Sequence, residues 1–125
     1  EIRAKFPRGK GMWPAIWMLP DEPSPYGTWA ADGEIDIAEG WGSKPNNVAH
    51  TIHYGGQWPN NVYSGTTVEY PNGGAADGWH TYTLEWTPGV LKWFVDGQLT
   101  QTKTSWCFTV RKVQVSQRCF QGQAS

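Results

Sequence analysis

Three carboxylates stand close together in an otherwise apolar stretch of this sequence. The stretch GEIDIAEG places Glu34, Asp36 and Glu39 among two isoleucines and an alanine. Side chains alternate between the two faces of a β-strand, so Glu34 and Asp36 share one face and the isoleucines fill the other, which must be core. A regular strand would also send Glu39 into that core, where an unpaired buried carboxylate is costly.

A β-bulge at Ile37–Ala38 removes this conflict. One extra residue in the strand resets the alternation and brings Glu39 onto the face of Glu34 and Asp36. Bulges recur beside active sites because they re-aim a side chain in this way. We therefore predict a bulged strand that carries all three acids on one face.

Such a cluster suits glycoside hydrolysis. Three neighbouring carboxyl groups repel one another, so at least one pKa should be raised. Glycoside hydrolysis uses one ionised carboxyl group to attack the anomeric carbon and one protonated group to donate to the leaving oxygen. A third acid between them can hydrogen-bond the nucleophile and tune both, and a separation of about 5–5.5 Å belongs to a retaining mechanism.

Two other interpretations of the acid cluster stay open at this point. The strand could lie at the surface, with its isoleucines buried and its three acids merely solvated. The acids could also bind calcium through their oxygens, although a strand wraps poorly around an ion that takes about six or more ligands.

The elements that must position the acids are predicted to be β-strands. Fifteen Gly and nine Pro punctuate short segments, and no long stripe with helical period occurs, which indicates an all-β sandwich or barrel. The predicted strands are Glu1–Phe6, Ala15–Leu19, Glu34–Glu39, Val48–Tyr54, Gly65–Tyr70, His80–Trp86, Val90–Val95 and Gln98–Lys103. The clearest pattern is a three-stranded antiparallel meander over Thr81–Thr102, in which Asp96-Gly97 is a strong two-residue hairpin signal.

Length and charge exclude several classes of protein. A chain of 125 residues with a net charge of -1 predicts one domain and no nucleic-acid partner, since no basic block appears. No segment approaches the roughly 20 apolar residues that a membrane span needs. Cys107 and Cys119 are too few for a disulfide scaffold and could form one bridge or none.

Tryptophan is used far more than in an ordinary domain, with nine residues. Flat aromatic faces stack well on sugar rings, and we expect about half of the indoles in the core and the rest along a groove. Trp29 and Trp58 stand alone in predicted loops, where each is either a ligand contact or part of a satellite core. The predicted loops are Pro20–Ala31, Gly40–Asn47, Gly55–Asn61 and Pro71–Gly78.

The acid motif and its surroundings resemble a known family. The pattern E-x-D-x-x-E, together with GMWPAIWML, YGTWAADGEIDIAEGWG, HTIHYGGQW and WHTYTLEWTPGVLKWFVDG in that order, resembles the laminarinase-like branch of glycoside hydrolase family 16. The resemblance runs from about Glu1 to about Trp106. It implies a β-jelly-roll (concanavalin-like) sandwich of antiparallel sheets with a concave groove, and retaining endo-hydrolysis of β-1,3-glucan.

The resemblance also implies roles for particular residues. Glu34 matches the nucleophile, Glu39 the general acid/base and Asp36 the assisting acid between them. His53 stands where the family has a histidine close to the catalytic carboxylates, although a core histidine bonded to backbone is the alternative. Three further residues match sugar-stacking positions, although some of them could belong to the core: Trp13, Trp17 and Trp29.

Partners and cofactors follow from the same resemblance. We expect a secreted, monomeric hydrolase that acts on a polysaccharide without a cofactor. The structural calcium of the family lies far from the groove and its usual donors fall outside this sequence, so we predict no metal. One alternative is a glucan-binding or recognition protein that has lost catalysis, and such proteins typically lack one of the two glutamates. The other is a hydrolase of mixed-linkage glucan, agarose or carrageenan. A sulfated galactan would require Arg or Lys in the groove.

Two departures from the family stand out. A complete jelly roll of this family is about twice as long, so the resemblance implies a sandwich incomplete at both ends. Residues 107–125 do not resemble the family's continuation, and a truncation or a shifted reading frame would explain this. We therefore divide the chain into a partial catalytic domain over 1–106 and an atypical tail over 107–125 of uncertain structure.

Overall fold

The computed structural model describes residues 1–21, 23–108 and 118–121. Within these ranges all regular secondary structure is β. The described residues therefore contain no helix that could cross a membrane. The strands are β1 (Ile2–Ala4), β2 (Ala15–Met18), β3 (Glu34–Trp41), β4 (Lys44–Tyr54), β5 (Val62–Glu69), β6 (His80–Thr87), β7 (Val90–Val95), β8 (Gln98–Lys103), β9 (Ser105–Phe108) and β10 (Arg118–Gln121).

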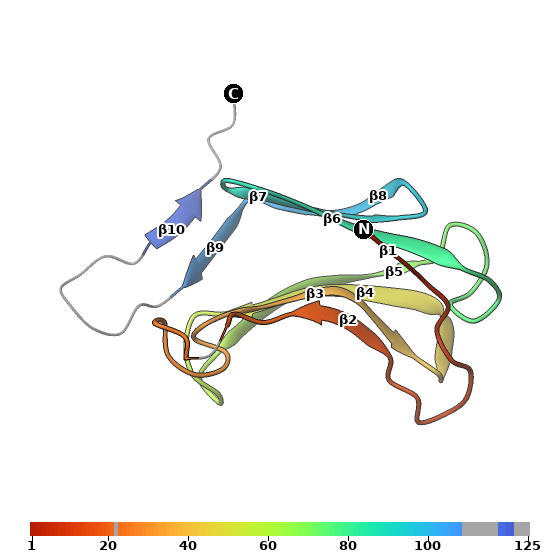
Figure 1. Cartoon of the computed structure of the whole chain (residues 1–125), viewed down its shortest axis with the longest axis horizontal. Helices are drawn as coiled ribbons and strands as arrows, with labels where there is room; N and C mark the ends of the chain where they lie inside the picture. Colours follow the sequence, from red (N-terminus) through yellow and green to blue (C-terminus); the bar gives the residue numbers. More distant parts are fainter. Residues whose placement is uncertain (22, 109–117, 122–125) are drawn as a thin grey trace.

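Two four-stranded sheets pack face to face (Figure 1). One has the order β1-β6-β7-β8 and the other β2-β3-β4-β5, and all neighbouring strands are antiparallel. The chain begins in the first sheet, forms the whole second sheet as one meander, and then returns to the first. β9 and β10 form a separate pair beside the sandwich. The predicted all-β sandwich is confirmed.

The predicted meander at Thr81–Thr102 is also confirmed, as β6, β7 and β8. Val95 pairs with Gln98, which leaves Asp96 and Gly97 as a two-residue turn. Their φ values are 50° and 78°, and two consecutive positive φ angles are what the favoured two-residue hairpin turn requires. The Asp96 carboxylate accepts a hydrogen bond of 2.9 Å from the backbone N–H of Thr81, which ties the turn to β6.

The predicted loop over 40–47 is wrong. β3 continues to Trp41 and β4 already begins at Lys44, so the connection is a tight turn. The first residues of β4 are exposed. Their polar side chains therefore carry no alternation, which is why the sequence KPNN looks like a loop. β5 likewise begins at Val62, earlier than predicted, and β1 ends at Ala4.

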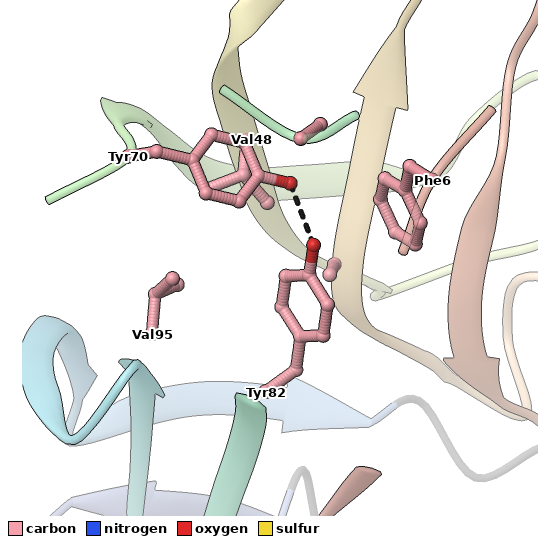
Figure 2. Close-up of a cluster of buried hydrophobic side chains, with 7 residues drawn as sticks. Phe6, Val48, Tyr70, Tyr82 and Val95 are labelled. Carbon is pink, nitrogen blue, oxygen red and sulfur yellow. Dashed lines mark hydrogen bonds between the residues drawn. The ribbon is translucent and has the colours of Figure 1, made fainter. Parts of the chain in front are cut away.

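Two clusters of buried side chains fill the space between the sheets. The larger cluster contains Phe6, Ala38, Val48, Tyr70, Ala75, Tyr82 and Val95. The second contains Ile35, Ile52, Leu91, Trp93 and Trp106. Figure 2 shows the larger cluster, in which the hydroxyls of Tyr70 and Tyr82 lie 2.8 Å apart in a hydrogen bond. Both clusters contain β3 residues, so the acid-bearing strand is anchored along its length.

The end of the chain is described only in part. The β9–β10 pairing sets the backbone of Cys107 opposite that of Cys119. Residues 109–117 and 122–125 lie outside the described ranges, so the division at residue 107 stays a prediction.

Candidate active site

The predicted bulge in β3 is present. Asp36 pairs with Thr51 and Glu39 pairs with Ala49, so three steps along β3 match two steps along β4. The pairing of β3 with β2 is shifted at the same place. Alternation alone would have put Ala38 beside the acids, but it is fully buried in the larger core cluster. The extra residue thus turns Ala38 inward and lets Glu39 point outward.

The acids share the outer face of the β2–β5 sheet with the predicted aromatic residues. Directly opposed residues of an antiparallel pair lie on the same face, and the register opposes Glu34 to His53 and Asp36 to Trp17. We call this surface the carboxylate face. It carries all seven predicted site residues, namely Trp13, Trp17, Trp29, Glu34, Asp36, Glu39 and His53.

Two indoles hold the outer carboxylates. The Trp13 Nε1–H donates a hydrogen bond of 3.1 Å to Glu39 Oε1, and the Trp29 Nε1–H donates to Glu34 Oε2. Trp13 precedes β2 and Trp29 precedes β3, so each donor reaches the face from a loop. Both side chains remain exposed, at 69% and 39%. Each indole can therefore orient a carboxylate through its N–H and still present a ring to a ligand.

The pKa of Asp36 is raised. Its side chain is almost fully buried. Burial, followed by the negative charges of Glu39 and Glu34 and a hydrogen bond with Glu34, raises the pKa of Asp36 from 3.8 to about 8. Asp36 therefore keeps a proton at neutral pH and can donate it in a hydrogen bond to Glu34. The sequence predicted one raised pKa, and the structure assigns it to the middle acid.

His53 lies on the carboxylate face beside Asp36, not in the core. Its Nε2 is 3.3 Å from Asp36 Oδ2. The imidazole lies between two aromatic rings, with centroid distances of 5.6 Å to Trp29 and 6.0 Å to Tyr63. These neighbours fix the orientation of the ring that faces the buried acid.

Tyr63 belongs to this face but was not predicted. It stands opposite His53 in the β4–β5 register and is 72% exposed. The predicted strand began at Gly65 and the predicted loop ended at Asn61, so Tyr63 was assigned to neither. The β4–β5 pairing continues from Gly65 back to Val62. A strand predicted to match the full length of its partner up to Tyr54 would have included Tyr63.

Three side chains of this face are close enough together to share a metal ion. One donor atom each from Glu34, Asp36 and His53 lie within 4.8 Å of one another. Metal ligands must be deprotonated, whereas the raised pKa of Asp36 favours its protonated form at neutral pH. Metal binding would therefore compete with the proton of Asp36.

The expected division of the tryptophans is wrong in its proportions. Only Trp93 and Trp106 are buried, and Trp41 is half-buried. The six exposed tryptophans are Trp13, Trp17, Trp29, Trp58, Trp79 and Trp86. Three of them lie on the carboxylate face. Trp58, in the loop after β4, is 70% exposed and its backbone N–H donates to the Trp29 carbonyl.

These features define a β-sandwich of the glycoside-hydrolase type, with a row of carboxyl groups between exposed indoles on one sheet. The profile of the family described as "Glycosyl hydrolases family 16" matches residues 1–116, and the chain belongs to that family. The family resemblance seen in the sequence is thereby confirmed.

The relatives include both hydrolases and a binding protein. The chain is 50% identical over 99 residues to "Glucan endo-1,3-beta-glucosidase A1" of Niallia circulans, covering 78% of this chain and 14% of that protein. It is 43% identical over 110 residues to the "Beta-1,3-glucan-binding protein" of Penaeus monodon, covering 82% of this chain and 30% of the relative. The solved laminarinase of Rhodothermus marinus superposes with a TM-score of 0.69 at 41% identity, over 80% of this chain and 40% of that one. The chain thus spans less than half the length of each.

Proposed function

We propose that the protein hydrolyses β-1,3-glucan at internal linkages with retention of anomeric configuration. The observation that carries this proposal is the β3 bulge, which puts Glu34, Asp36 and Glu39 on one face beside exposed indoles. A cluster of three mutually repelling acids is unfavourable for structure alone, whereas glycoside hydrolysis requires carboxyl groups in different protonation states.

In this mechanism Glu34 is the nucleophile and Glu39 the general acid/base. The ionised Glu34 attacks the anomeric carbon while Glu39 donates its proton to the glycosidic oxygen that leaves. A water molecule then gives a proton to Glu39 and attacks the anomeric carbon, which breaks the ester to Glu34 and restores both groups. Two displacements at the same carbon give retention.

Asp36 and His53 would assist without bonding to the sugar. With its raised pKa, Asp36 is neutral at pH 7 and adds no negative charge beside the nucleophile. Its hydrogen bond to Glu34 orients the attacking carboxylate. His53 packs beside the assisting acid, with its Nε2 3.3 Å from Asp36 Oδ2.

The exposed indoles would bind the glucan. Trp13, Trp17 and Trp29 offer ring surface within the carboxylate face, and sugar C–H groups stack on such rings. None of the eight residues named on this face is Lys or Arg, which favours a neutral glucan over a sulfated galactan such as carrageenan.

A glucan-binding protein without catalysis is the second candidate, because one relative is named for binding. Loss of catalysis in such proteins would go with loss of an acid from the cluster. This chain keeps Glu34, Asp36 and Glu39, which favours the hydrolase.

The test compares Glu34→Gln and Glu39→Gln with the wild type on laminarin. Glu85→Gln serves as the matched control, because Glu85 is an exposed glutamate of β6 in the other sheet. We expect both site variants to lose hydrolysis and keep laminarin binding, and the control to keep both. Proton NMR of the first product should show the β-anomer. Full activity in Glu34→Gln would refute the assignment.

The same assay separates the alternatives. Binding of laminarin by the wild type without reducing-end release would indicate the binding protein. Faster release from mixed-linkage glucan, agarose or carrageenan than from laminarin would keep the chemistry and change the substrate.

A further inference from the structure

Two backbone carbonyls at the bulge are bonded by side chains from elsewhere in the sandwich. The Trp93 Nε1–H, on β7 of the opposite sheet, donates a hydrogen bond of 2.9 Å to the carbonyl of Asp36. On β4, His50 Nδ1 lies 2.7 Å from the carbonyl of Ile37. The two carbonyls are consecutive and lie where the β3 ladder is interrupted.

The bulge depends on these donors for its hydrogen bonds. A bulge disrupts the ladder locally, and a buried carbonyl left without a partner costs about 1–3 kcal/mol. Trp93 and His50 are both completely buried and lie against each other, with ring centroids 6.3 Å apart. They therefore compensate from the core side for the ladder bonds that the extra residue removes.

Thr100 on β8 lies within hydrogen-bond distance of both residues, and its hydroxyl can donate to one of them at a time. Its Oγ1 is 2.9 Å from His50 Nε2 and 3.0 Å from the carbonyl oxygen of Trp93. A carbonyl only accepts, so the His50 nitrogen that faces Ile37 must carry the proton. Burial lowers the pKa of His50, so its ring is neutral and Nε2 is an acceptor. The Thr100 hydroxyl has one proton, and when it is donated to Nε2 it fixes the tautomer that bonds the bulge, while the Trp93 carbonyl then receives no hydrogen bond from Thr100.

We propose that Trp93, His50 and Thr100 are positioning residues that set the geometry of the bulge and, through it, the relative placement of Glu34, Asp36 and Glu39. None of the three lies on the carboxylate face, so none can touch a glucan bound there. Their effect passes through the β3 backbone. This inference rests on the proposed function for its kinetic consequence, but the contacts themselves do not depend on it.

The test uses substitutions that each remove one hydrogen-bond donor. Thr100→Val removes the hydroxyl that fixes His50, and Thr100→Ser restores it. Trp93→Phe removes only the indole N–H and part of the ring. Tyr82→Phe is the matched control, because it deletes a buried hydrogen bond of the same core, to Tyr70, and leaves the hydrogen bonds to the bulge carbonyls in place.

Kinetics on laminarin give the first readout. We expect Thr100→Val and Trp93→Phe to lower kcat by about tenfold to hundredfold with KM within about twofold, since small displacements of reacting groups have effects of this size. Thr100→Ser and Tyr82→Phe should stay within about threefold of the wild-type kcat. Equal kcat in Thr100→Val and Thr100→Ser, both folded by near-ultraviolet circular dichroism, would overturn the proposal.

The second readout needs no activity. Carboxyl carbon NMR titration follows Asp36 in each variant, and a relaxed bulge should expose its carboxyl group and lower its pKa by about one unit or more. The pKa should not move in Thr100→Ser or Tyr82→Phe. If the wild type hydrolyses nothing but the pKa shifts appear, the proposed function fails and the positioning role stands. An unmoved pKa in both Thr100→Val and Trp93→Phe refutes the positioning role.

Discussion

Replacing Asp36 by asparagine should stabilise the protein at neutral pH, and the gain should grow as the pH rises. Folding raises the pKa of Asp36 from 3.8 to about 8 through burial and the neighbouring charges of Glu39 and Glu34. Between these two values the folded state holds a proton that the unfolded state has released. The folded state is therefore penalised progressively as the pH rises from about 4 to about 8. The asparagine side chain does not ionise in this pH range, so the Asp36→Asn variant does not pay this penalty.

The size of the effect follows from proton linkage. A difference of one bound proton changes the free energy of unfolding by about 1.4 kcal/mol per pH unit. From pH 5 to pH 7 the difference between Asp36→Asn and the wild type should therefore rise by up to about 3 kcal/mol in favour of the variant. Below about pH 4 the folded and unfolded states both hold the proton, and only the change of shape and hydrogen bonding remains.

Urea denaturation at several pH values between 5 and 8 measures this difference. Other groups titrate in both proteins and cancel when the two curves are subtracted. Asp77→Asn is the control: hydrogen bonds from Gly74 and Arg8 lower the pKa of that exposed carboxyl, so it is ionised in both states over this range and its difference curve should be flat. A flat curve for Asp36→Asn as well would refute the raised pKa. Under the proposed mechanism the variant should also hydrolyse laminarin more slowly, because the amide replaces the carboxylic acid whose hydrogen bond orients Glu34.

Two further substitutions test how the loops hold the acids. Gly42→Ala should destabilise the fold by about 3 kcal/mol in a thermal or urea melt, because a Cβ at residue 42 would lie 1.6 Å from the carbonyl oxygen of Gly9. The control is Gly78→Ala, whose Cβ meets nothing within 4 Å and should leave stability unchanged. Equal melting points for the two variants would contradict the steric argument. Trp29→Phe keeps a stacking ring but removes the hydrogen bond to Glu34, so kcat/KM on laminarin should fall by about tenfold, as expected for a bond to a charged group, and an unchanged value would show that the indole N–H is dispensable.

The bulge could be predicted from sequence because its cause is local. Glu39 cannot share a buried face with Ile35 and Ile37, and one inserted residue is the smallest change that resolves the conflict. The hairpin at Asp96-Gly97 was predictable for a similar reason, since the turn requires residues that tolerate positive φ.

The support of the bulge could not be predicted in the same way. Alternation in Val48–Tyr54 puts His50 on the inner face with Ile52, and a polar residue among inward positions is a signal that it bonds something. The partner is set by how the two sheets stack, which sequence periodicity does not specify. Trp93 likewise looked like one more core aromatic, although its N–H reaches the carbonyl of Asp36.

We expected about half of the tryptophans in the core, but six of the nine are exposed. The number of tryptophans in a sequence does not tell whether they fill the core or lie on the surface. A sandwich of two four-stranded sheets has room for Trp93 and Trp106 in its second cluster, where they pack among aliphatic residues. The first cluster uses Phe6, Tyr70 and Tyr82 as its large side chains. The remaining indoles had to lie outside, and the carboxylate face receives three of them.

The path of the chain has a consequence for building chimaeras. The whole carboxylate face comes from the contiguous stretch 13–63, because β2 to β5 follow one another in a single meander. A cassette of this kind could be exchanged between sandwiches to transfer the proposed sugar-binding surface. The recipient would have to offer an indole and a hydroxyl at the positions of Trp93 and Thr100, because the cassette carries its bulge but not the donors that reach it from the other sheet. Grafts into recipients that lack these two groups should bind glucan and turn it over slowly.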